Sequence, residues 1–128
     1  MAMIRDTSII PLVPMWPGTI DPAEMFLNYD EEADRLTVAF GGAARPCTVD
    51  PVDGDAANYL SLRLDPLTED VVGVELESVA LALREHPRWR IVVNAAPTEP
   101  AMRRVSPDAW IALRAFVDEA KVLASSGD

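Results

Sequence analysis

The chain has 128 residues, a formal net charge of −10, and only one cysteine and one histidine, Cys47 and His86. A chain of this length can form one domain without disulfides or metal ions. One cysteine and one histidine exclude an intramolecular disulfide and a Cys/His zinc site. We expect no membrane helix and no secretory signal, and therefore a cytoplasmic protein with no membrane partner. Residues 1–83 carry 15 acidic residues against 4 arginines, so phosphate backbones should be repelled and we expect no nucleic-acid partner.

Residues 1–24 should form an extended arm. Prolines at positions 11, 14, 17 and 22 interrupt both a helix and a central strand. The arm is rich in apolar side chains, so we expect it to lie in a groove on its own domain or on a neighbouring subunit. The members of this apolar set are Ile9, Ile10, Leu12, Val13, Met15 and Trp16. Residues 25–128 are then a single α+β domain, with a sheet over 25–80 and a helical extension over 81–128.

From residue 25 to residue 76 the pattern predicts short strands. Large apolar side chains occupy every second position over 25–29, 35–40 and 60–64, which is typical of a sheet with one covered and one wet face. Residues 47–49 can form an edge strand, and residues 71–76 another strand. We therefore expect four or five antiparallel strands in chain order. Glu75 and Glu77 should both point to the wet face.

The period changes after residue 76. Apolar spacing predicts a short helix, which Ser78 could cap and which ends before Pro87. The stretch 90–95 contains several β-branched residues, and this favours a further strand. Pro107 and Asp108 mark the start of a last helix. Its apolar stripe, which should cover the sheet, consists of Trp110, Leu113, Phe116, Val117, Ala120 and Leu123. The expected fold class is α+β: an antiparallel β-meander of four or five strands, a short helix, and a C-terminal helix packed on one face.

An acidic cluster lies between the first two expected strands. Asp30, Glu32 and Asp34 occupy alternate positions, as the first ligands of a calcium loop do. The match fails further on, because Arg35 stands where the loop needs glycine and Gly41 where it needs a bidentate glutamate. A looser divalent-cation site stays open. The alternative is a solvated hairpin turn in which Asp30 accepts hydrogen bonds from the amides two and three residues on.

The same stretch carries a resemblance to a known family. NYDEEADRL, followed by NYLSLRLD and then VVGVEL, resembles the small bacterial family called domain of unknown function 2283. The resemblance covers about residues 25–80. The matching positions are Tyr29, Asp30, Asp34, Leu36, Asp65, Gly73, Val74 and Glu75. The chain departs from the family pattern in having Thr37 where a tyrosine is usual and a longer loop at 50–58. The resemblance implies a small meander with a helix and no known activity.

Other residues offer weaker candidates for chemistry. Nothing in the sequence brings Cys47 and His86 together as a nucleophile and base. Arg103 and Arg104 precede the last helix, where free amides favour an anion. Neutralisation of the acidic sheet loops is the competing explanation for these two arginines. We assign no catalytic residue and no cofactor.

These observations favour a non-catalytic interaction or structural module, expected to be a homodimer and open to another protein partner. Two alternatives remain at this point. One is divalent-cation binding at Asp30, Glu32 and Asp34. The other is small-molecule anion binding or a small enzyme that uses Arg103 and Arg104.

Overall fold

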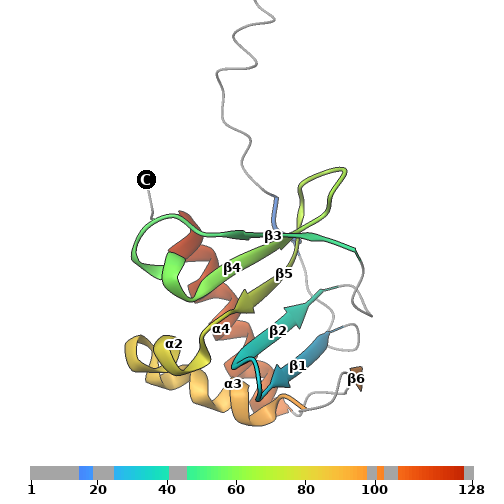
Figure 1. Ribbon diagram of the computed structural model, residues 1–128. Coiled ribbons are helices and arrows are strands. Elements are labelled where there is room, and N and C mark those ends of the chain that lie inside the picture. The colour runs from blue at the N-terminus through green and yellow to red at the C-terminus, as the bar shows by residue number, and fades with distance from the viewer. Residues whose placement is uncertain (1–14, 19–24, 41–45, 98–100, 103–106, 126–128) are drawn as a thin grey trace, which may run out of the picture.

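The computed structural model describes residues 15–18, 25–40, 46–97, 101–102 and 107–125 (Figure 1). Its main feature is an antiparallel sheet in the order β3-β4-β5-β2-β1-β6. The strands are β1 (Phe26–Asp30), β2 (Arg35–Ala39), β3 (Thr48–Pro51), β4 (Leu60–Leu64), β5 (Val71–Leu76) and the two-residue β6 (Ala101–Met102). The expected α+β class with an antiparallel sheet is confirmed.

The strands do not follow one another strictly in chain order. β1 and β2 form a hairpin, β3, β4 and β5 form a meander, and β5 pairs with β2 to join the two units. Every residue of β5 is buried, so this strand gains most from a central position with a neighbour on each side. The connection after β2 therefore leads to the far edge, where β3 is exposed throughout.

Gly73 allows β5 to fit between its neighbours. A Cβ atom at this position would lie 2.4 Å from the carbonyl oxygen of Val38 and 2.9 Å from the Cδ of Arg63. The backbone of β2 is held by its pairing with β1 and β5 and cannot move away, so only glycine is accommodated here.

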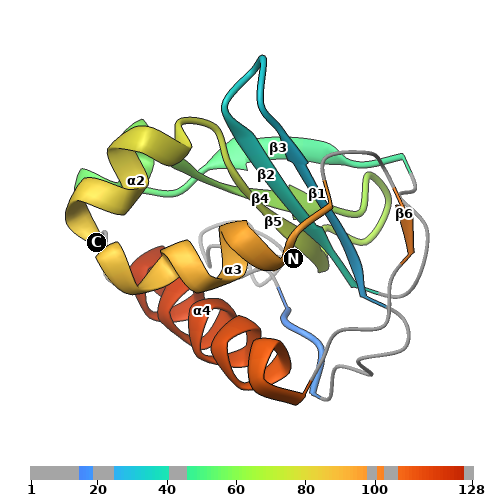
Figure 2. The ribbon, with the colours of Figure 1, turned by 90° about the horizontal axis from the view of Figure 1, so that it is seen from below.

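In the described part of the chain, three α-helices lie on one side of the sheet (Figure 2). They are α2 (Val79–Glu85), α3 (Arg90–Ala95) and α4 (Pro107–Ser125), and two 3-10 turns, η2 (Asp55–Asn58) and η3 (Pro87–Trp89), accompany them. α4 begins at Pro107 with Asp108 in its first turn, and it buries Leu113, Phe116, Val117 and Ala120. These side chains share one core with the inner face of the sheet, which confirms the predicted covering helix.

The prediction of a strand over residues 90–95 is wrong, because these residues form α3. Pro87 occupies the first turn of η3, and the buried Trp89 anchors the chain as it continues into the helix. Val92 and Val93 are the buried residues of α3, so core packing overrides the weak β preference of branched side chains. The free edge of β1 pairs instead with β6.

Only residues 15–18 of the expected N-terminal arm are described. The carbonyl oxygen of Met15 accepts a hydrogen bond of 2.8 Å from the amide of Val71. The ring of Trp16 lies 6.5 Å from that of Phe40, measured between centroids. This short segment therefore lies along the start of β5. The rest of the arm is outside the described residues.

Candidate functional site

The acidic cluster forms the turn between β1 and β2. The Oδ1 atom of Asp30 accepts hydrogen bonds from the amides of Glu32 (3.1 Å) and Ala33 (3.2 Å), as the turn interpretation predicted. Asp34 adopts a φ of 52°, a left-handed conformation that aspartate tolerates better than most residues. Glu31 and Glu32 are exposed. The cluster is thus a turn with a solvated tip.

Asp34 connects this turn to α2. Its Oδ1 atom accepts a 2.8 Å hydrogen bond from the hydroxyl of Tyr29, and its Oδ2 atom accepts one of 2.8 Å from the amide of Ala80. Its carbonyl oxygen accepts another of 3.0 Å from the amide of Val79. Ser78, the predicted cap, makes no side-chain capping bond. Asp34 therefore supplies the N-terminal cap of α2 from a distant part of the sequence.

The environment of Asp34 also affects Tyr29. The hydrogen bond to Asp34 is the largest cause that raises the pKa of the Tyr29 hydroxyl above 10.0, and burial and the negative charge of Asp34 act in the same direction. The protonated hydroxyl of Tyr29 is therefore the form that donates the hydrogen bond to Asp34 and stabilises the hairpin tip.

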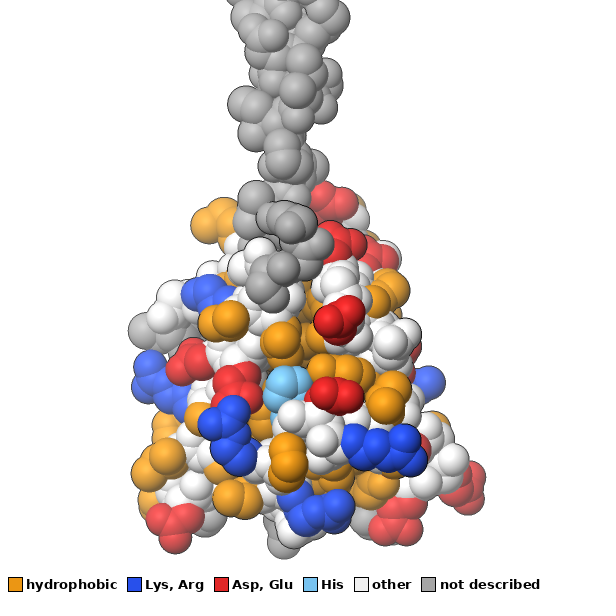
Figure 3. All heavy atoms as spheres, turned by 90° about the vertical axis from the view of Figure 1, so that its left-hand side faces the viewer, with side chains coloured by type: hydrophobic (Ala, Val, Ile, Leu, Met, Phe, Trp, Pro, Cys, Tyr) orange, Lys and Arg blue, Asp and Glu red, His pale blue; other side chains and the backbone are white. Residues whose placement is uncertain are grey.

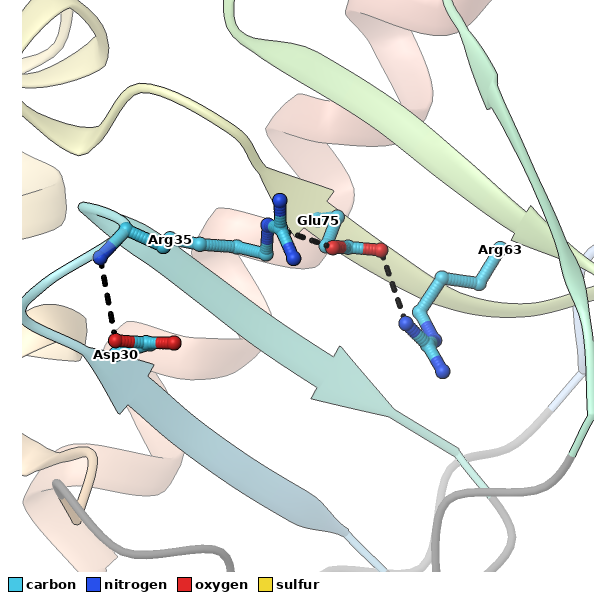
Figure 4. Close-up of polar contacts among 5 residues, drawn as sticks. Asp30, Arg35, Arg63 and Glu75 are labelled. Carbon is cyan, nitrogen blue, oxygen red and sulfur yellow. Dashed lines mark hydrogen bonds and ion pairs between the residues drawn. The ribbon is translucent and has the colours of Figure 1, made fainter.

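Glu75 does not face water. It is only 4% exposed, and its two carboxylate oxygens are bound by Arg63 at 2.9 Å and Arg35 at 3.3 Å. Figure 4 shows the two arginines reaching it from the neighbouring strands β4 and β2. The prediction that Glu75 and Glu77 share a wet face is wrong for Glu75, because flanking arginine side chains cover a carboxylate in the middle of the sheet. Glu77 follows the strand and is exposed.

A second cluster surrounds the only histidine, where α2 ends and η3 begins. The His86 ring stacks on Trp89 with centroids 3.9 Å apart and planes 15° apart. Its Nε2 atom shares a 2.9 Å hydrogen bond with the hydroxyl of Tyr59. Burial is the main cause that raises the pKa of Tyr59 above 10.0, with the charges of Glu85 and Asp55 adding to it. His86 is thus held in one orientation from two sides.

Glu119 of α4 completes this cluster. It accepts a 2.8 Å hydrogen bond from the indole nitrogen of Trp89 through Oε2, and Oε1 lies 2.9 Å from a guanidinium nitrogen of Arg88. Trp89 also packs edge-on against Phe116, with centroids 4.9 Å apart. These contacts attach η3 to α4 and fix the positions of the polar side chains between them.

A surface pocket of about 310 Å³ lies between η3 and α4. It is lined by His86, Arg88, Asp118, Glu119, Val122 and Leu123. Figure 3 shows the histidine on this face, with hydrophobic, acidic and basic side chains around it. The pocket combines an aliphatic wall from α4 with charged groups at its margin. We call it the His86 pocket.

The other candidates from the sequence lie apart from this pocket or outside the described residues. Cys47 precedes the edge strand β3 and is a free, partly exposed thiol, whereas the ring of His86 contacts Tyr59 and Trp89. Arg103 and Arg104 fall outside the described residues. Within the part of the chain that the structure describes, no three or more His, Cys, Asp or Glu side chains are placed to hold a metal ion. Among the described helices, none is both long and apolar enough to cross a membrane.

Sequence reasoning missed the His86 pocket. His86 and Trp89 are three positions apart, a spacing at which two rings can stack in one helical turn, and this was the available signal. Glu119, Val122 and Tyr59 are far away in sequence and carry no motif. Only the packing of α4 brings them to the histidine.

Comparison of the chain with family models, curated proteins and solved structures found no match. The fold itself therefore defines the class: an α+β protein with an antiparallel sheet covered on one side by helices. The likeness to family 2283 stays a prediction.

Proposed function

We propose that the protein is a non-catalytic interaction module that binds an aliphatic side chain of a protein partner in the His86 pocket. The observation that carries this proposal is that His86, Arg88 and Glu119, which line the pocket, each have a hydrogen-bond or ion-pair partner within the protein. The hydroxyl of Tyr59 shares a hydrogen bond with His86, and Trp89 and Arg88 engage both carboxylate oxygens of Glu119. These groups build a fixed frame, which favours recognition over proton transfer.

The size and chemistry of the pocket support a side chain as its ligand. A volume of about 310 Å³ lies at the small end of the range for pockets that hold drug-sized ligands. Val122 and Leu123 supply the apolar surface, and Arg88 and Asp118 are exposed beside it. An apolar centre with a charged rim is the usual composition of a protein interface.

The experiment is an NMR titration of the ¹⁵N-labelled protein with N-acetyl-isoleucine methylamide. We expect saturable shifts confined to the amides of His86, Glu119 and Val122, with a dissociation constant of about 1 mM or weaker. Val122→Asp should abolish these shifts. Leu67→Asp should leave them unchanged, because Leu67 is 92% exposed on the β4–β5 turn. Equal shifts with N-acetyl-glycine methylamide, or no saturation, would contradict the proposal.

We also propose that the chain is a divergent member of family 2283, and the contacts of its motif residues support this. Tyr29 and Asp34 hydrogen-bond to each other and Asp34 caps α2, so these two positions have a joint structural role. A cytoplasmic location fits the free thiol of Cys47. Localisation of the tagged protein in cells tests the cytoplasmic location. Sequences intermediate between this chain and the family members, aligned over residues 25–80, test the family assignment.

A further inference from the structure

The outer face of α4 carries two large aliphatic side chains in water. Ile111 is 69% exposed and Val122 is 65% exposed. They are eleven residues apart, which is three helical turns, so they point in nearly the same direction. Ala115 and Asp118 lie between them on the same face and are exposed as well. The face is therefore aliphatic at both ends and small or charged in the middle.

This face is complementary to itself under two-fold symmetry. If two copies of α4 pack antiparallel about an axis at the level of Phe116 and Val117, Ile111 of each copy lies opposite Val122 of the other. Val122 forms part of the wall of the His86 pocket. The small Ala115 lies near the axis, where two helices must approach most closely. One contact is thus made twice, as an isologous interface requires.

The charges on the face select the antiparallel arrangement. Arg114 and Asp118 are both exposed. In the antiparallel pair, Arg114 of one copy lies across from the turn that carries Asp118 of the other, which gives two attractive contacts. A parallel pair would place Arg114 against Arg114 and Asp118 against Asp118, and such like-charge contacts are unfavourable.

We infer that the partner recognised at the His86 pocket is a second copy of this chain, whose Ile111 fills the pocket beside Val122 in a symmetric α4–α4 dimer. This inference rests on the proposed function, because it names the side chain that the pocket binds. The pocket and the protruding isoleucine lie at opposite ends of one helix face, so a dimer satisfies both at once.

Sedimentation velocity over a range of protein concentrations tests the inference. We expect a monomer–dimer equilibrium in the wild type, and Ile111→Asp should raise the dissociation constant more than about tenfold. Leu67→Asp is the matched control, since it makes the same kind of change at an exposed residue remote from α4, and it should leave the dimer intact. Circular dichroism checks that each variant remains folded.

A charge exchange gives a second readout that loss of folding cannot imitate. Arg114→Asp and Asp118→Arg should each weaken the dimer, whereas the double variant should restore it, because both cross-copy pairs are then present with reversed polarity. A wild type that stays monomeric at every concentration would overturn the inference. So would a dimer that is insensitive to Ile111→Asp and to the single charge changes.

Failure of the inference and failure of the proposed function are distinguishable. The Ile111→Asp variant keeps the walls of the His86 pocket, so the isoleucine amide can be titrated into it without competition from a second copy. Binding in that variant, together with a monomeric wild type, leaves the proposed function standing and removes the second copy as the occupant. Absence of binding in that variant removes the proposed function.

Discussion

Glu75 offers the sharpest test of how ion pairs across β2, β5 and β4 stabilise the sheet. Replacing Glu75 by alanine removes the carboxylate that two guanidinium groups share. The side chain of Arg35 is 50% exposed and can turn into water, so its contribution is only about 0 to 1 kcal/mol. The side chain of Arg63 is 14% exposed, and it would be left as a nearly buried charge without a partner.

Breaking a buried ion pair by removing one partner costs about 3 to 5 kcal/mol. Because Arg63 keeps some access to water, we expect Glu75→Ala to lower the free energy of unfolding by about 3 kcal/mol, near the lower end of that range. Glu75→Gln keeps the shape and one acceptor, so its cost should be smaller. Arg35→Ala is the matched control and should cost about 1 kcal/mol or less.

Urea unfolding followed by tryptophan fluorescence measures these differences. The double variant Glu75→Ala, Arg63→Ala should lose less stability than the two single variants together, with a coupling of about 1 to 3 kcal/mol, because the second change removes the stranded charge. A loss below about 1 kcal/mol for Glu75→Ala, or strict additivity in the double variant, would refute the reasoning.

Two further predictions concern the core and the tyrosines. Phe116→Ala should lower the free energy of unfolding by about 3 to 5 kcal/mol, because Phe116 is 1% exposed and packs against Trp89; a melting temperature close to the wild-type value would contradict this packing. Both tyrosines of the chain, Tyr29 and Tyr59, have a raised pKa, so tyrosinate absorbance should develop at higher pH in the folded protein than in urea. Since the folded pKa values lie above the unfolded value of about 10, this stability contribution is complete below about pH 10 and is lost as the pH rises through the folded values. Tyr29→Phe should remove part of the loss of stability at alkaline pH. A tyrosinate titration that is identical in urea and in buffer would contradict the raised pKa values of the folded protein.

Much of the fold could be predicted because its signals are local. Alternation at Leu36 and Val38 is enough to identify a strand with one buried face, since side chains in a strand point to opposite sides in turn. Pro107 and the apolar stripe identify α4 in the same way. The hydrogen bonds of Asp30 within its turn also follow from residues two and three positions away.

The sequence by itself thus determined the strands β1 to β5, the covering helix and the turn at Asp30, because each depends on neighbours along the chain. Only the tertiary structure decided that residues 90–95 are helical, that Glu75 is buried between two arginines, and that His86, Trp89 and Glu119 form one cluster beside a pocket. These features depend on residues distant in sequence, and the free energy of burying Trp89 and Val92 exceeds the weak local preference for a strand. Periodicity shows which face of an element is covered, whereas the partner that covers it follows from the packing of the whole chain.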